Sequence, residues 1–315
     1  MEQSNAVDRL ILGHTPFVGI SYQSIEKDRE YRRRFSDSKL IRNVVDAALT
    51  EGVNVFAAAT PDSSPLAPLH LKVLREVIDE GYKIELIPCV GINLRIGTKK
   101  LDAFRRWATY LSVEKDIYPK IRERVLEDPI LNFRKGWRQI LPKSIPYDKK
   151  DFERLRADWR IIDEGLEFFV ELPVSYMEPG SETDFLAMTG RFDLLGELVD
   201  RIKERGFKRV MFGVHHAGIT IPMLEEGLTG FNGFLTPLNY LGVMMLPTQS
   251  AAEKAIQNSG KTVFSIKPLA GARIGPEIAF NYVFSFNVDG CMIGCASPRE
   301  VEEDIRAAVK AQRTS

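Results

Sequence analysis

Short apolar runs alternate along the chain with segments in which apolar residues recur every three or four positions. The runs have the length of β-strands. In the segments between the runs, the apolar residues have the spacing of helices that bury one face, as at Ile41, Val44 and Ala48. The pattern predicts eight strands, at 10–13, 53–59, 83–89, 166–172, 210–214, 233–238, 262–266 and 290–294. It predicts helices at 40–51, 68–80, 192–205, 221–226, 251–258, 276–284 and 298–312. Eight alternations favour the α/β class, and within it a (β/α)8 TIM barrel over a doubly wound sheet.

The alternation lapses between the third and fourth predicted strands, from 93 to 163. This stretch is rich in Arg, Lys, Trp and Tyr and has helical spacing near 100–111 and 149–158. It is too long for an ordinary connection, so we expect a helical insertion that acts as a lid, a binding loop or an oligomer contact, or that pads one side of the protein. We treat 1–315 as a single barrel domain with 93–163 as an insertion in it.

Polar residues stand at the carboxyl end of nearly every predicted strand. In a barrel these ends converge on one face, where active sites are built, so residues far apart in the sequence become neighbours there. The residues are His14, Thr60, Cys89, Glu171, His215, His216, Asn239 and Lys267.

These strand-end residues have several possible roles. An unpaired carboxylate in an apolar strand is costly, so Glu171 is expected to be catalytic, a metal ligand or an ion-pair partner of Lys267 or an arginine. Lys267 is a substrate anchor, a cation that lowers a neighbour's pKa, or that ion-pair partner. Because adjacent strand residues point to opposite sides, we expect one of His215 and His216 in the site and favour His215. Cys89 is a site residue or a small packed side chain.

Composition narrows the class of partner. The chain has 315 residues and is 44% hydrophobic, enough for a large core. It carries 43 basic and 43 acidic residues, so no net field draws it to nucleic acid or a membrane, and we expect a small-molecule substrate. Three cysteines do not suggest a disulfide framework, the N-terminus lacks the pattern of a signal peptide, and no apolar run is long enough for a membrane span. We expect a cytoplasmic protein and leave its oligomeric state open.

The closing part of the chain resembles the aldo-keto reductases. The resemblance rests on 265–271 (SIKPLAG) and 288–303 (VDGCMIGCASPREVEE), with shorter matches at 13–19 (GHTPFVG), 52–56 (GVNVF), 212–214 (FGV) and 238–240 (LNY). It implies a (β/α)8 barrel that reduces carbonyl groups with a nicotinamide cofactor. That family uses an aspartate, a tyrosine, a lysine and a histidine at the ends of strands two to four.

The chain departs from the family at those four positions. The aspartate falls on Ala57, the lysine on Cys89 and the histidine on Glu171, while the tyrosine falls near Asp62. The serine and asparagine that hold the carboxamide of the nicotinamide fall on His215 and His216. The basic residues that grip the 2′-phosphate of NADP fall on Gly294 and Glu300, which disfavours NADP and leaves NAD(H) as the expected form.

Three hypotheses follow. In the first, a nicotinamide-dependent oxidoreductase has rebuilt acid/base residues, with Glu171, His215, Lys267 and Cys89 as catalytic candidates. Its cofactor would be held by the phosphate-binding turn at 294–297, through Gly294, Ala296 and Ser297, and by His216 and Asn239. In the second, His14, Glu171 and His215 bind Zn, Fe or Mn for lyase, isomerase or hydrolase chemistry. In the third, the barrel binds a ligand without catalysis.

Overall fold

The computed structural model describes residues 6–313, so residues 1–5, part of the stretch considered above for a signal peptide, lie outside it. Eight parallel strands form one sheet in the order β7-β3-β2-β1-β11-β10-β9-β8. Their bounds are β1 (Leu10–Leu12), β2 (Val55–Ala59), β3 (Glu85–Val90), β7 (Glu178–Pro179), β8 (Met211–Gly213), β9 (Gly233–Pro237), β10 (Thr262–Ile266) and β11 (Gly290–Ile293). The two ends of the sheet meet at Met177, whose backbone bonds to Arg209 and Met211 at 2.9 and 3.0 Å. The predicted (β/α)8 barrel is confirmed.

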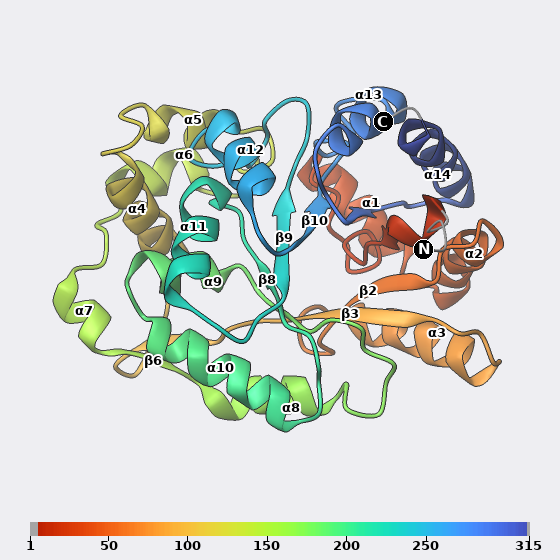
Figure 1. Cartoon of the computed structure of the whole chain (residues 1–315), viewed down its shortest axis with the longest axis horizontal. Helices are drawn as coiled ribbons and strands as arrows, with labels where there is room; N and C mark the ends of the chain where they lie inside the picture. Colours follow the sequence, from red (N-terminus) through yellow and green to blue (C-terminus); the bar gives the residue numbers. More distant parts are fainter. Residues whose placement is uncertain (1–5, 314–315) are drawn as a thin grey trace.

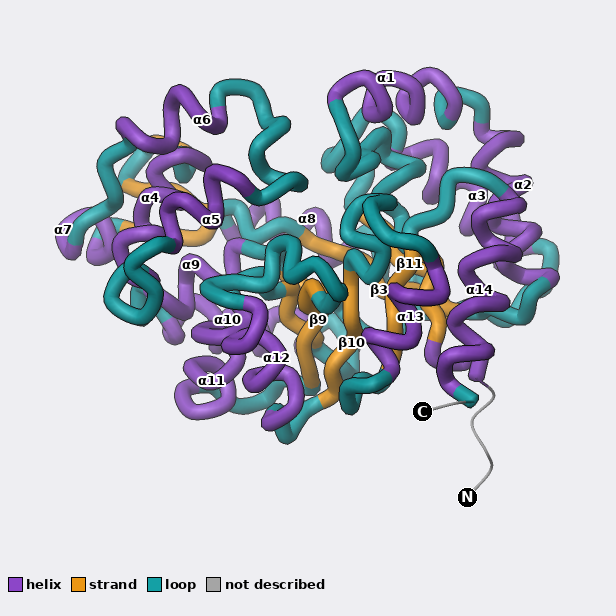
Figure 2. The backbone as a smooth tube through the Cα atoms, turned by 90° about the horizontal axis from the view of Figure 1, so that it is seen from above, coloured by secondary structure: helices purple, strands orange, loops and turns teal. Residues whose placement is uncertain are grey.

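Helices surround the sheet, as Figures 1 and 2 show from two directions. Their bounds are α1 (Ile25–Arg34), α2 (Ser38–Thr50), α3 (Ala67–Asp79), α8 (Trp159–Glu167), α9 (Glu182–Met188), α10 (Phe192–Glu204), α11 (Ala217–Gly227), α12 (Gln249–Asn258), α13 (Pro276–Phe284) and α14 (Pro298–Gln312). In α2 the side chain of Asp37 caps the first turn, and Ile41, Val44 and Ala48 are buried on one face, as their spacing predicts.

Strand alternation divides the core in two. Leu10 and Leu12 join the large cluster between sheet and helices, whereas Ile11 joins a small cluster with Ala57 and Ile87. Partly buried residues from other parts of the barrel, Phe264 among them, pack on this small cluster. Since its members come from several strands, the small cluster fills the barrel interior beneath the mouth.

The predicted strand at 166–172 is wrong. Residues up to Glu167 belong to α8, and 168–170 form a turn, because Ile162, Leu166 and Phe169 are spaced to bury one helical face. The fourth barrel strand starts instead at Val174, which pairs with Leu86, and continues through β7. Glu171 therefore lies exposed in the connection before the strand and not at its carboxyl end.

The insertion at 93–163 forms its own substructure beside the barrel, on the left of Figure 1. It contains the antiparallel sheet β5-β4-β6, whose strands are β4 (Leu94–Ile96), β5 (Lys99–Lys100) and β6 (Leu155–Ala157). Its helices include α4 (Ala103–Glu114), α5 (Ile121–Glu127), α6 (Trp137–Ile140) and α7 (Lys149–Glu153). The helices expected near 100–111 and 149–158 correspond to α4 and α7, although β6 occupies the end of the second range.

Polar contacts hold the insertion against loops at the barrel mouth. Arg124 donates to the carbonyl oxygens of Gly242 and Met245 at 2.8 and 3.0 Å, and the carboxylate of Asp128 accepts from the backbone N–H of Met244 at 2.7 Å. From the other side, Arg273 donates to a carbonyl of the insertion at 2.9 Å. The insertion thus contacts the loops that follow β9 and β10. None of the helices in residues 6–313 is both long and apolar enough to span a membrane.

Candidate active site

The carboxyl ends of the strands bring five side chains from distant parts of the chain together, which we call the lysine cluster. Lys267 follows β10, His215 follows β8, Glu178 lies in β7 and Cys89 in β3, and Tyr22 comes from the loop after β1. The Nζ atom of Lys267 lies 3.1 Å from Nε2 of His215 and 4.8 Å from the centre of the Tyr22 ring. The sequence prediction included three of these residues and missed Glu178 and Tyr22.

Lys267 is the central group of the cluster. Burial lowers its pKa to about 8, and the charge of Arg134 adds to this effect, while the charge of Glu178 opposes it. No carboxylate of the described residues lies within ion-pair distance of its amine. The backbone of Lys267 has φ +57°, a left-handed conformation that non-glycine residues seldom adopt and that clusters at functional sites.

His215 contacts this amine with a neutral imidazole. Burial, followed by the charge of Lys267, lowers the pKa of His215 well below its ordinary value. An ammonium on Lys267 donates to the lone pair of Nε2, and a neutral amine accepts from Nε2–H in the other tautomer. His14 lies at the same mouth, where burial and the charge of Lys267 lower its pKa to about 4. Its Nδ1 atom is buried and has no hydrogen-bond partner within residues 6–313.

Glu178 supplies the carboxylate that the sequence assigned to Glu171. Burial raises the pKa of Glu178 to about 7, opposed by the charge of Lys267 and a hydrogen bond with Cys89. The carboxylate passes over Gly213 of β8, where an added Cβ would lie only 2.5 Å from Oε1. The local sequence signal for this position is weak, because 174–177 (VSYM) does not alternate cleanly between apolar and polar residues.

Cys89 and Tyr22 stay protonated at neutral pH. Burial, with added repulsion from the Glu178 carboxylate, holds the pKa of Cys89 well above its ordinary value, so its sulfur is a neutral thiol and a poor nucleophile. Burial raises the pKa of Tyr22 to about 12. Its hydroxyl is therefore a hydrogen-bond donor, held by a loop whose carbonyl at Tyr22 accepts from Arg273 at 2.9 Å.

The adjacent histidines point to different surroundings. His216 is 1% exposed, and its Nδ1 lies 2.6 Å from Oε1 of Glu114 on α4. Its ring packs against those of Trp107 and Tyr110. Burial alone would lower the pKa of His216, but the Glu114 carboxylate outweighs it and leaves the pKa raised. The carboxylate of Asp184 accepts from both histidine backbones, at 2.8 and 3.3 Å. His216 therefore ties the insertion to the barrel and does not face Lys267.

The residues expected to hold a nicotinamide cofactor are engaged elsewhere. The side chain of Asn239 closes its own loop by donating to and accepting from the backbone of Val243, at 3.0 and 2.9 Å. In the turn after β11, Ser297 accepts from the N–H of Glu300 at 3.2 Å, and the carboxylate of Glu300 accepts from Ala296 at 2.7 Å. A carboxylate thus occupies the donor that a cofactor phosphate would use.

The other predicted groups of this turn and of the metal site are likewise not assembled. Gly294 is exposed and its α-carbon faces the ring of Pro16. Of the predicted metal ligands His14, Glu171 and His215, Glu171 lies exposed before the fourth strand, whereas His14 and His215 follow the carboxyl ends of β1 and β8. The part of the chain from 6 to 313 contains no group of three or more His, Cys, Asp or Glu arranged to hold a metal ion.

Comparison with known proteins supports the fold. No family model and no curated protein matches the chain. Among solved structures, the chain is similar to one described as "Putative aldo-keto reductase from Pseudomona aeruginosa", with a TM-score of 0.54 and 15% sequence identity over 96% of this chain and 90% of that one. At this identity the likeness shows the (β/α)8 barrel and its chain course, and the chemistry must be argued from the lysine cluster.

Proposed function

We propose that this barrel is an enzyme of carbonyl chemistry in which the amine of Lys267 forms an imine with a small aldehyde or ketone substrate. The observation that carries the proposal is the amine itself, which is buried at the barrel mouth, contacts a neutral imidazole and has no carboxylate partner within ion-pair distance. Lysines that form Schiff bases are activated in this way, by desolvation and by neighbouring cations.

The protonation state suits this reaction. With a pKa of about 8, roughly one Lys267 in ten is a neutral amine at pH 7, compared with about one in three thousand for an unperturbed lysine. The neutral amine attacks the carbonyl carbon, a proton moves to the carbonyl oxygen to give a carbinolamine, and loss of water gives the iminium ion. His215 can accept the proton that the amine loses, because its imidazole is neutral and its Nε2 lies 3.1 Å from Nζ.

Glu178 is the acid/base group for the steps that follow. An iminium ion withdraws electrons, which allows a proton to leave the adjacent carbon or an adjacent carbon–carbon bond to break. A carboxyl group with a pKa of about 7 can take that proton as a carboxylate and return it as an acid. Hydrolysis of the iminium ion returns Lys267 as an amine and releases a carbonyl product, so no other reactant than water is required. The class proposed is therefore a lyase or isomerase.

A nicotinamide-dependent oxidoreductase is the second candidate, and one observation favours it. The aldo-keto reductases use a tyrosine, a lysine, a histidine and an aspartate. The lysine cluster contains the same residue types, with a glutamate as the carboxylate, but at other positions, namely Tyr22, Lys267, His215 and Glu178. A bound nicotinamide would supply hydride. The groups expected to hold it are engaged in contacts within the chain.

Reductive trapping separates the candidates. The purified protein is incubated with pyruvate, glyoxylate or glycolaldehyde and sodium borohydride, and its intact mass and peptides are measured. Imine chemistry predicts one covalent adduct per chain, located on Lys267, absent from Lys267→Met and retained in Lys208→Met, which alters an exposed lysine. The same samples are mixed with NADH and each carbonyl compound, and absorbance at 340 nm is followed.

Each result has one meaning. An adduct on Lys267 without NADH oxidation supports the imine proposal. NADH oxidation without an adduct overturns it in favour of the oxidoreductase. If a folded protein shows no adduct and no NADH oxidation, both candidates are overturned. A barrel that binds a ligand without catalysis then remains.

A further inference from the structure

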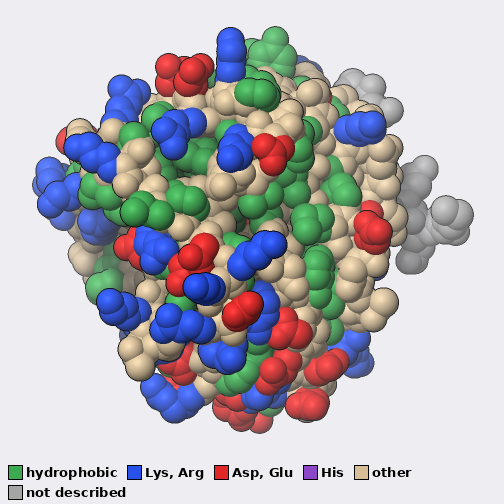
Figure 3. All heavy atoms as spheres, turned by 90° about the vertical axis from the view of Figure 1, so that its left-hand side faces the viewer, with side chains coloured by type: hydrophobic (Ala, Val, Ile, Leu, Met, Phe, Trp, Pro, Cys, Tyr) green, Lys and Arg blue, Asp and Glu red, His purple; other side chains and the backbone are tan. Residues whose placement is uncertain are grey.

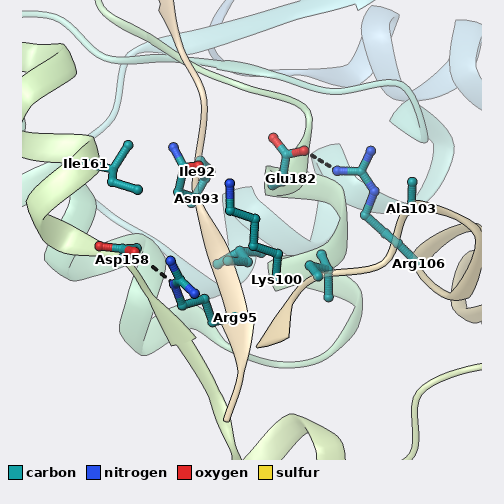
Figure 4. A pocket seen from close by; sticks show the side chains of 11 residues that line it. Ile92, Asn93, Arg95, Lys100, Ala103, Arg106, Asp158, Ile161 and Glu182 are labelled. Carbon is teal, nitrogen blue, oxygen red and sulfur yellow. Dashed lines mark hydrogen bonds and ion pairs between the residues drawn. The ribbon is translucent and has the colours of Figure 1, made fainter. Parts of the chain in front are cut away.

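A polar pocket lies between the barrel and the insertion. It has a volume of about 190 Å³ and is formed where the chain leaves β3, crosses β4 and β5, and enters α4, α8 and α9. Figure 4 shows charged side chains from these elements around it. Its polar lining residues are Asn93, Arg95, Lys100, Arg106, Asp158 and Glu182.

The two acidic residues of the pocket are already paired. The Nε atom of Arg95 lies 2.8 Å from Oδ2 of Asp158, and Arg106 forms an ion pair with Glu182. Dashed lines mark both pairs in Figure 4. Neither carboxylate is therefore available to attract a cationic ligand, whereas a guanidinium has five N–H donors and each arginine keeps donors beyond those that its carboxylate uses.

The donors of the pocket are in excess. Lys100 stands between the two ion pairs in Figure 4, and no acidic group in the described residues lies within 4.0 Å of its ammonium. The Nε atom of Arg106 is buried and has no hydrogen-bond partner in residues 6–313. A buried guanidinium N–H without an acceptor is unfavourable, and an anion placed here would satisfy it.

The surroundings add positive potential. Ala103, the first residue of α4, lines the pocket, as does Asp158 directly before α8, so two helices of nine residues or more begin at its wall. Figure 3, which faces the side of the molecule that carries the insertion, shows Lys and Arg side chains gathered over this face with fewer Asp and Glu among them.

The pocket is electrostatically coupled to the lysine cluster. The carboxylate of Glu182 contributes to the raised pKa of Cys89, and the guanidinium of Arg106 contributes to the lowered pKa of His215. Glu182 follows β7 closely, and Asn93 follows β3, the two strands that carry Glu178 and Cys89. A ligand group in this pocket therefore lies at the same mouth as the amine of Lys267.

We propose that this pocket binds the anionic group of a small substrate, a carboxylate or a phosphate, through Lys100, Arg95 and Arg106. Its volume exceeds the roughly 150 Å³ of an apolar cavity that holds benzene, so it accommodates either group with a short carbon chain. The assignment of this anion to a carbonyl substrate rests on the proposed function, whereas binding of the anion does not. The substrate class that follows is a carbonyl compound carrying an acid group, such as an oxo acid or a phosphorylated aldehyde.

The test is calorimetric titration of the intact chain with inorganic phosphate and, separately, with malonate, at constant ionic strength. Lys100→Met is compared with Lys99→Met, because the two lysines are adjacent in β5, are both exposed, and only Lys100 lines the pocket. We expect Lys100→Met to weaken binding roughly tenfold, the loss of one hydrogen bond between charged groups, and Lys99→Met to weaken it less than about twofold. Tighter binding of phosphate or of malonate distinguishes the two sources of the anion.

The proposal is overturned if neither phosphate nor malonate binds at 10 mM. It is also overturned if Lys100→Met and Lys99→Met weaken binding equally, because the anion would then respond only to the general charge of the surface. Lys267→Met separates this proposal from the proposed function. It should bind phosphate or malonate as the unaltered chain does, even if no imine forms. If trapping succeeds, Lys100→Met should raise the pyruvate concentration needed for half-maximal trapping and leave the maximal extent unchanged.

Discussion

Replacing Lys267 by methionine is expected to stabilise the protein at neutral pH while abolishing its reaction with carbonyl compounds. The folded chain holds the lysine at a pKa of about 8, compared with 10.5 for the free side chain. Because the folded state disfavours the protonated lysine, the charged side chain lowers the free energy of unfolding. The difference between the folded and unfolded pKa values corresponds to a loss of about 3 kcal/mol at pH 7. Methionine has a similar shape without the charge, although it leaves Nε2 of His215 without its partner, at a cost of about 1 kcal/mol. The net gain expected at pH 7 is therefore about 2 kcal/mol.

The pH dependence of this gain is the sharper test. Between the folded pKa and the unfolded pKa the unfolded chain binds more protons, so the unaltered protein becomes more stable as the pH rises from 8 to 10.5. The penalty falls to about 1 kcal/mol at pH 10, a change of about 2 kcal/mol that Lys267→Met should lack. Urea unfolding at pH 7 and pH 10 measures it, with Lys208→Met as the control. Parallel stabilities of the unaltered and Lys267→Met proteins across this range would refute the reasoning, because the amine would then be no less basic than in water.

Three further predictions concern the surroundings of the cluster. Gly213→Ala should push the Glu178 carboxylate aside, since the new Cβ would lie 2.5 Å from Oε1, and lose about 1–3 kcal/mol of stability together with most of the trapping. The control is Gly196→Ala in α10, where a new Cβ would meet only Cδ1 of Leu228 at 4.0 Å, an ordinary contact, so this variant should be neutral or slightly stabilising in the same assays. Asp128→Asn should cost about 1–3 kcal/mol and speed hydrogen exchange in the loop after β9, because it weakens the contact of the insertion with that loop; unchanged exchange would contradict this role. His14 is neutral in the folded chain, with a pKa of about 4 against 6.5 for the free side chain, so the free energy of unfolding falls as the pH drops from 6.5 to 4. His14→Gln should reduce this fall by up to about 3 kcal/mol, as measured by acid unfolding.

Most of the barrel was predictable because its strands and helices have strong local patterns. The strand around Met211 is short, apolar and followed by two histidines, and the structure has β8 there with His215 and His216 at its end. Both histidines lie beyond the end of β8, so two-residue alternation does not apply to them, and their different surroundings come from the turn into α11. The helices with apolar residues on one face, such as α2 and α10, agree with the prediction to within a few residues.

The fourth strand was mispredicted because its local signal is weak. The apolar residues at 166–172 fit a buried helix end as well as a strand, and short apolar runs do not separate the two. The true strand is short and pairs by isolated bridges at Val174 and Met177, so few local features distinguish it. The error moved the expected carboxylate from Glu178 to Glu171 and with it the expected metal site.

The sequence by itself determined the barrel, the insertion and the positions of His215 and Lys267 after their strands, because periodic burial and strand-end position are encoded locally. Only the tertiary structure decided which carboxylate and which tyrosine join them, because Tyr22 and Glu178 meet Lys267 through closure of the sheet and not through sequence spacing. It also decided the chemistry of the lysine, since the pKa of an amine depends on burial and on charges that arrive from distant parts of the chain. The insertion is an example, because it brings Arg134 and Asp128 to a site built by the barrel.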